Sequence, residues 1–148
     1  MRVSAKGRYA LAAMIEIARQ TRTEESVPVV VISKTLGISK IFLEQTVSQL
    51  KKDGLLYSIK GKKGGYQLAR EANNITVYDV LAAIESGLLE KAGETVPHQS
   101  PSIEATLALR VWETLDDAIE AALQGISIQD LLDQSEQLGN DQAFMMNM

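Results

Sequence analysis

Three lysines stand close together on a glycine-rich stretch of this 148-residue chain. The stretch reads Gly61-Lys62-Lys63-Gly64-Gly65, and Lys60 precedes it. Ammonium groups on a short turn can contact phosphate oxygens, and glycines let a backbone approach a ligand closely. The stretch does not match a nucleotide-binding P-loop, because Leu56 stands where that pattern requires its first glycine. We therefore interpret it as a basic finger for a phosphate backbone.

Residues suited to catalysis or metal binding are few. The chain has no cysteine, which excludes disulfides, thiolate-ligated zinc, cysteine-held iron-sulfur clusters and a cysteine nucleophile. The one histidine, His98, has no metal-spaced carboxylate pair near it, and we interpret it as solvated. The pair Asp116-Asp117 falls on the exposed side of a predicted helix. We predict no enzyme activity, no metal site and no cofactor.

Charge is distributed unevenly along the chain. Residues 1–70 carry 13 Lys and Arg against 5 Asp and Glu, a net charge of +8. Residues 71–148 carry 2 against 14, a net charge of −12. A basic half can follow a phosphate backbone, whereas an acidic half is better suited to pairing subunits or binding a protein partner.

The basic half reads as three helices followed by a hairpin. Ser4 caps a first helix that ends near Gln20, and Pro28 opens a short second one that ends at Gly37. Its β-branched start, Val29 to Ile32, is also compatible with a strand. Ser39 caps a third helix, where Leu43, Val47 and Leu50 share one buried side and leave a polar, basic side exposed. Strands are predicted over Leu55 to Lys60 and Tyr66 to Arg70.

The acidic half begins with a fourth helix, which starts at a capping box of Thr76 and Asp79. A loop from Leu88 to Ser100 leads to a long helix from Pro101 to about Gln124, whose apolar surface is wider than one small domain needs. A second capping box at Ser127 opens a last short helix, followed by a methionine-rich tail from Gly139.

This order of elements is that of a winged helix-turn-helix. The predicted fold is mainly α with a small β-hairpin: a DNA-binding domain over residues 1–86, then an effector loop, a dimerisation helix and a tail over residues 87–148. A helix fits the major groove of DNA, while a basic hairpin can contact phosphates or the minor groove. We predict a dimer that binds duplex DNA. The alternative is a winged helix that docks on proteins and binds no DNA.

Three short segments resemble the transcription regulators typified by IscR, NsrR and CymR, which sense iron-sulfur status, nitric oxide and cysteine metabolism. They are MRVSAKGRY from Met1, LEQ from Leu43 and the wing GKKGGY from Gly61. The resemblance covers residues 1–86 closely and the long helix more loosely. It implies that Ser39, Glu44 and Gln45 read bases, and that Lys60 stands where an arginine commonly enters the minor groove. Lysine lacks the planar guanidinium fork, so we expect a phosphate contact there.

Two residue sets complete the predicted site. Ile41 either contacts a thymine methyl or packs against its own domain, and Trp112 serves either the dimer interface or the core. The predicted DNA contacts are Arg2, Lys6, Tyr9, Ser39, Lys40, Ile41, Glu44, Gln45, Lys51, Lys52, Lys60, Lys62 and Lys63. The predicted dimerisation residues are Leu107, Val111, Trp112, Leu115, Ile119 and Leu123.

The loop from Leu88 to Ser100 departs from the cluster-binding members of that family, which place cysteines there. We therefore expect no iron-sulfur cluster. The cysteine-free loop and the apolar tail resemble the cysteine-metabolism branch, in which cysteine synthase acts as corepressor. The resemblance thus implies a repressor of cysteine or sulfur metabolism, with cysteine synthase as a candidate partner.

The amino terminus superficially resembles a signal peptide, since Arg2, Lys6 and Arg8 flank an apolar run from Tyr9 to Ile15. Glu16 ends that run, and no small-residue cleavage site follows. No segment approaches the roughly 20 apolar residues that span a bilayer. We expect a cytoplasmic protein that does not interact with membranes.

Overall fold

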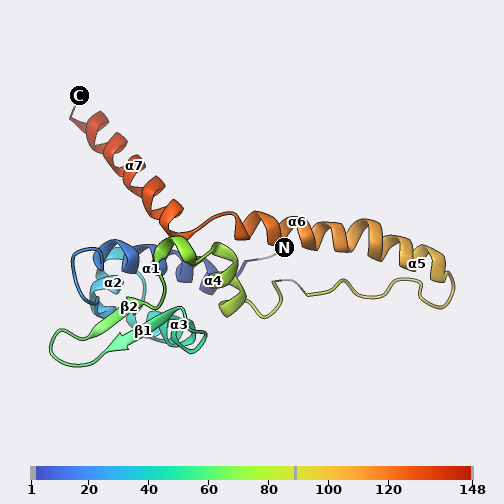
Figure 1. Ribbon diagram of the computed structural model, residues 1–148, viewed down its shortest axis with the longest axis horizontal. Helices are drawn as coiled ribbons and strands as arrows, with labels where there is room; N and C mark the ends of the chain where they lie inside the picture. The colour runs from blue at the N-terminus through green and yellow to red at the C-terminus, as the bar shows by residue number, and fades with distance from the viewer. Residues whose placement is uncertain (1–2, 89, 148) are drawn as a thin grey trace.

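The computed structural model describes residues 3–88 and 90–147, and its helices and strands follow the predicted order (Figure 1). The N-terminal half contains α1 Ala5–Gln20, α2 Val29–Leu36, α3 Lys40–Lys52, β1 Leu56–Ile59, β2 Gly65–Leu68, the 3-10 turn η1 Ala72–Asn74 and α4 Val77–Ile84. The C-terminal half contains α5 Pro101–Leu107, the π-helical segment η2 Ala108–Trp112, α6 Glu113–Gln124 and α7 Ile128–Met146. The predicted fold, mainly helical with one hairpin, is confirmed.

The core lies where α1 packs against α3, α4 and the start of α7. Met14, Ile17 and Leu43 are fully buried there. The predicted caps form: Ser4 Oγ accepts a hydrogen bond from the backbone N–H of Gly7 at 3.1 Å, and Ser39 Oγ accepts one from Phe42 at 3.5 Å. These caps satisfy backbone donors that a helix leaves unpaired at its start.

The segment after Pro28 is a helix, so the strand alternative for Val29 to Ile32 is wrong. Its side chains face the core at helical spacing, and Gly37 closes it in the left-handed conformation at φ 67°. The residue that pairs with the hairpin is Val27, which directly precedes Pro28. Val27 exchanges two backbone hydrogen bonds with Tyr66, of 3.0 and 2.8 Å, and so extends the hairpin sheet.

The wing, residues Leu56–Leu68, is an antiparallel hairpin in which Leu56 pairs with Leu68 and Ile59 with Gly65. Its strands are one or two residues shorter than predicted. A Cβ atom on Gly65 would lie 2.4 Å from the carbonyl carbon of Val27, so only glycine fits where the hairpin crosses that residue. Gly65 therefore allows the wing to pack closely against Val27 of its own domain.

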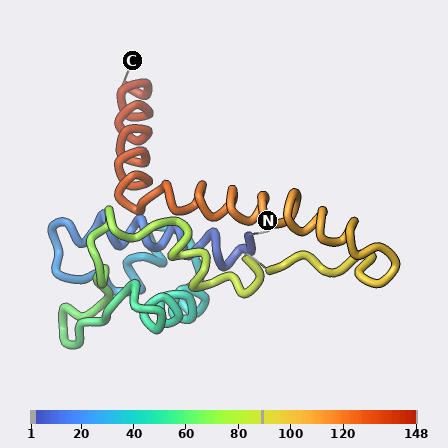
Figure 2. The backbone as a smooth tube through the Cα atoms, turned by 45° about the vertical axis from the view of Figure 1, so that its right-hand side comes forward, coloured from blue at the N-terminus to red at the C-terminus, as the bar shows by residue number. Residues whose placement is uncertain are grey.

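The segments α5, η2 and α6 form one continuous helical arm, residues 101–124, which extends away from the N-terminal half (Figure 1). Its extent matches the predicted long helix, although the π-helical segment at its middle was not expected. Ser100 occupies the cap position, but its side chain makes no capping hydrogen bond. The residues described between 90 and 100 have no helix or strand, as predicted, and run beside the arm to its tip (Figure 2).

Helix α7 corrects the prediction of a short helix followed by a tail, because it continues through Gly139 to Met146. The capping box predicted at Ser127 starts it. Side-chain amides support its exposed face: Gln129 donates to Asp133 at 2.8 Å and Gln137 donates to Asp141 at 3.3 Å. The tail sequence contains no proline, and its Ala, Phe and Met residues are compatible with a helix.

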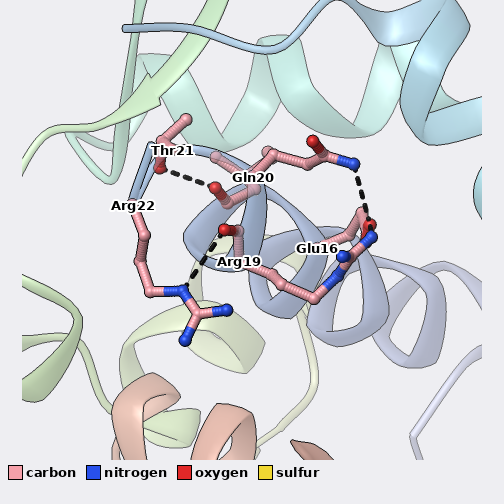
Figure 3. A network of polar contacts seen from close by, with 6 residues as sticks. Glu16, Arg19, Gln20, Thr21 and Arg22 are labelled. Atoms are coloured by element: carbon pink, nitrogen blue, oxygen red, sulfur yellow. Dashed lines mark hydrogen bonds and ion pairs between the residues drawn. The ribbon is translucent and has the colours of Figure 1, made fainter. Parts of the chain in front are cut away.

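Polar contacts cluster at the end of α1 and in the turn after it (Figure 3), and one ion pair joins that turn to α7. Glu16 is only 5% exposed, and its carboxylate accepts hydrogen bonds from Arg19, including one from Nε at 3.1 Å. That hydrogen bond raises the pKa of the Arg19 guanidinium. Arg22 Nη1 lies 2.6 Å from Glu136 Oε1 on α7, an ion pair whose geometry makes no hydrogen bond.

The boundary expected between residues 86 and 87 stays a prediction. Two side chains from beyond it, Ile128 and Leu132, belong to the same buried cluster as α1 and α3. The first turns of α7 thus complete the core of the N-terminal half. Across residues 3–88 and 90–147, every helix is too short or too polar to cross a membrane.

Candidate nucleic-acid interface

Helix α3 presents a polar side to solvent, as its spacing predicts. Glu44, Gln45, Lys51 and Lys52 are exposed, and Lys40 Nζ lies 3.8 Å from Glu44 Oε1. Ile41 is 70% exposed, so it does not pack against its own domain. The alternative in which Ile41 packs against its own domain is therefore wrong, and its contact with a thymine methyl stays a prediction.

The start of α1 lies against α3. The ring of Tyr9 meets Phe42 edge to face, with centroids 5.3 Å apart. Lys6 Nζ donates a hydrogen bond of 2.8 Å to Gln49 Oε1 on α3. Both predicted contact residues of this helix are thus positioned by α3, while Arg2 lies outside the described residues.

The wing is attached to the rest of the domain by side-chain contacts. Lys51 on α3 donates to Ser58 Oγ on β1 at 2.9 Å, and Ser26 Oγ donates to the backbone carbonyl of Lys63 at 2.6 Å. Lys60, Lys62 and Lys63 are exposed. The structure therefore brings α1, α3 and the wing together as one connected basic surface.

Most lysines on this surface keep their charge available. Among the basic residues predicted to contact DNA within residues 3–88 and 90–147, Lys40 is the only one in an ion pair, and its partner Glu44 is itself a predicted contact residue. An unpaired ammonium group attracts phosphate more strongly than one already neutralised by a carboxylate. The surface is thus suited to a polyanion.

In the segment predicted as an effector loop, two backbone N–H groups bind the carboxylate of Glu104. The backbone N–H groups of Thr95 and Val96 donate to Glu104 in the first turn of the arm, at 3.1 and 2.6 Å. His98 is exposed, in agreement with a solvated residue. Over the described ranges, no three His, Cys, Asp or Glu side chains are gathered as metal ligands. Because the chain also has no cysteine, its donor set does not fit a cysteine-held iron-sulfur cluster.

The predicted dimerisation residues lie along the arm, where no side chain is fully buried. Leu115 is 51% exposed, and Val111, Trp112 and Ile119 are half-buried. Leu123 packs against the buried cluster formed by Val77, Leu81 and Leu88 of its own chain. The dimer role of these residues stays a prediction.

Gln49 of α3 joins α1 to α4, although no pattern in the sequence predicts this role. Its Oε1 accepts a hydrogen bond from Lys6 Nζ, and its Nε2 donates one to the backbone carbonyl of Ala83 at 3.0 Å. Neither partner is near Gln49 in the chain, and its polar side chain on the rim of a helix resembles any solvated glutamine. No local signal identifies it.

Comparison with known proteins places this architecture in a family. Residues 3–134 match the Rrf2 family model, described as an iron-dependent transcriptional regulator. The chain is 35% identical to the HTH-type transcriptional regulator IscR of Photorhabdus laumondii over 138 residues, covering 93% of this chain and 83% of that protein. It is 36% identical to IscR of Pectobacterium atrosepticum over 141 residues, with the same coverage.

Solved structures agree with the sequence relatives. CymR, the global cysteine regulator of B. subtilis, superposes with a TM-score of 0.75 at 31% identity, covering 90% of this chain and 98% of that one. IscR of T. potens superposes with a TM-score of 0.72 at 33% identity, covering 93% and 90%. These proteins are regulators, so the predictions of a regulatory role and no enzyme activity are confirmed. The chain belongs to the Rrf2 family of transcriptional regulators.

Proposed function

We propose that this regulator represses transcription by binding an operator in duplex DNA as a homodimer. The observation that carries the proposal is the connected basic surface of α1, α3 and the wing. Its parts are joined by the contacts Lys6–Gln49 and Lys51–Ser58, so they approach a duplex as one body.

Within this surface, the start of α3 reads bases and the wing binds the backbone. Ser39, Glu44 and Gln45 lie in the first turns of α3 and are exposed, which suits contacts with base edges in the major groove. Ile41 meets a thymine methyl. Lys60, Lys62 and Lys63 contact phosphates, because an ammonium group on a flexible stem acts as a point charge.

The arm forms the dimer interface. Ile103, Leu109 and Leu115 remain more than half exposed along it, although apolar side chains of a stable helix are normally covered. A second copy of the same helix would cover them by symmetry. Two recognition helices held about 34 Å apart, or a multiple of that distance, then meet successive turns of one DNA face.

The regulated process is cysteine or sulfur metabolism, and the signal is delivered without a cysteine-held cluster. Two observations support this assignment: the chain has no cysteine, and its fold superposes on CymR, the global cysteine regulator of B. subtilis. The end of α7 exposes Phe144, Met145 and Met146, an apolar surface for a corepressor such as cysteine synthase.

Salt dependence tests the DNA-binding proposal against the alternative of a protein-docking module. If each subunit contacts about four to six phosphates, the logarithm of affinity falls with the logarithm of salt at a slope of about −0.9 per phosphate. Affinity for duplex DNA would be measured from low to high salt. A flat response would contradict DNA binding and favour docking.

The regulated process needs a separate experiment. DNA fragments retained by the purified protein would be sequenced, and binding to the recovered operator would be measured with and without purified cysteine synthase. We expect operators near genes of sulfur metabolism and tighter binding with the enzyme present. Operators elsewhere, unaffected by the enzyme, would contradict the assignment while leaving DNA binding intact.

A further inference from the structure

A hollow between α1 and α3 opens on the basic surface. Four of its residues come from one side of α3, at spacings of three and four along the helix, and Lys6 of α1 closes it. Its lining is Lys6, Gln45, Ser48, Gln49, Lys52 and Asp53. Two ammonium groups, a hydroxyl, two amides and the carboxylate of Asp53 surround a space open to solvent. The donors outnumber this single carboxylate, so the combination suits a phosphate group.

The amide of Gln49 is held in one orientation. Its Oε1 accepts from Lys6 Nζ at 2.8 Å, and its Nε2 donates to the backbone carbonyl of Ala83 at 3.0 Å. An ammonium group can only donate and a carbonyl can only accept, so exchanging the two ends of the amide would break both hydrogen bonds. The contacts themselves thus assign the orientation.

The carbonyl of Ala83 belongs to the last turn of α4. The last four carbonyls of a helix have no partner within it, so the Gln49 amide satisfies a group that would otherwise be unpaired in a half-buried place. This contact fixes Gln49, and Gln49 in turn restricts Lys6, a side chain with high conformational freedom when unrestrained.

We propose that Gln49 is a positioning residue, which holds Lys6 so that the hollow takes one backbone phosphate of the DNA. This inference rests on the proposed DNA-binding function and deepens it. An ammonium group has three donors. One is used by Gln49, and the other two remain for phosphate oxygens, with Lys52 and Ser48 contributing from α3.

The experiment measures duplex affinity against salt for Lys6→Met, Gln49→Met and the double variant. Both subunits of the dimer carry each change, so losing one phosphate contact per subunit makes the salt slope shallower by about 1.8 and weakens binding about 60-fold at 0.1 M salt. We expect Lys6→Met to show this loss and Gln49→Met to reproduce most of it. The double variant should lose no more than Lys6→Met alone, because both changes remove the same contact.

Two control variants match these changes in chemistry. Gln137→Met removes an exposed amide that donates to Asp141 on the same helix, α7, and Lys91→Met removes an exposed charge on the segment beside the arm. Both should keep the wild-type affinity and slope. The variant Gln49→Glu should also make the slope shallower by about 1.8, because its carboxylate neutralises Lys6 in each subunit.

Several results would overturn the inference. If Gln49→Met melts at a lower temperature but keeps the wild-type slope, the residue supports the fold only. If the losses of the two single variants add in the double variant, Gln49 does not act through Lys6. A wild-type protein with a flat salt response would remove the proposed DNA-binding function as well, whereas a steep wild-type slope shared by Gln49→Met removes only this inference.

Discussion

Each of the helices α1 to α4 buries apolar side chains, whereas the arm buries none along residues 101–124. Charge also divides the chain, since residues 1–70 carry a net charge of +8 and residues 71–148 a net charge of −12. In the first half, a small domain closes its core and displays lysines. In the second, a helix displays leucines and carboxylates side by side.

This difference separates two ways in which a helix is stabilised. Short helices gain most of their stability from packing an apolar side against neighbours, which α1 and α3 do within the chain. The arm also has an apolar side, but residues on it such as Leu109 and Leu115 are exposed to solvent and do not pack against other parts of the chain. Helix α7 combines both conditions, since its start is in the core and its end is in solvent.

The sharpest test of this comparison lies within α7. Leu132 is 1% exposed and Leu138 is 54% exposed, although both are leucines on one helix. Leu132→Ala should lower the free energy of unfolding by about 2–5 kcal/mol, the cost of a cavity in a core, and Leu138→Ala by less than about 0.5 kcal/mol. Chemical denaturation of both variants measures the difference. Equal losses would mean that α7 is not divided between core and solvent.

A charge on the arm should separate the subunits of the proposed dimer. Leu115→Glu places a carboxylate in the apolar side that a second copy would cover, so we expect monomers in sedimentation. Operator binding should weaken about 100-fold or more, because the second half-site no longer binds within the same complex. Thr114→Glu adds the same charge at a neighbouring exposed position and should leave the dimer intact. Dimers that survive Leu115→Glu would place the interface elsewhere.

Local chemistry was enough to predict most of the first half. The capping residues Ser4, Ser39 and Thr76 form bonds within three residues, so their partners are visible in the sequence itself. The role of Gln49 was not predictable, because its partners Lys6 and Ala83 are 43 and 34 residues away.

The second half shows the same limit differently. The apolar spacing of the arm correctly predicted a long helix, but no pattern in the sequence indicated the π-helical segment from Ala108 to Trp112. Gly139 favoured an early end for α7, since glycine is a poor helix former. Only the core contacts of Ile128 and Leu132 and the amide–carboxylate pairs explain why the helix continues.

Base reading and backbone binding should separate on the basic surface. Gln45→Ala should weaken operator binding by about 1–3 kcal/mol and affect random DNA little, because a bidentate base contact is specific to sequence. Lys62→Ala should weaken binding to both DNAs alike and make the salt slope shallower by about 1.8, because each subunit of the dimer loses one phosphate contact. Titrations with operator and random duplexes compare the two. An equal loss on both DNAs for Gln45→Ala would mean that it positions the protein without reading sequence.

The smallest effect is expected where the two halves meet through charge. Arg22 Nη1, in the turn after α1, lies 2.6 Å from Glu136 Oε1 on α7, but the two side chains are 52% and 39% exposed. Exposed ion pairs contribute about 0–1 kcal/mol, because water and salt screen them. A double-mutant cycle with Arg22→Met and Glu136→Gln should therefore give a coupling below about 1 kcal/mol that shrinks with added salt. A larger, salt-resistant coupling would mean that the ion pair holds α7 on the domain. The burial of Ile128 and Leu132 would then not be the main force that joins α7 to the core.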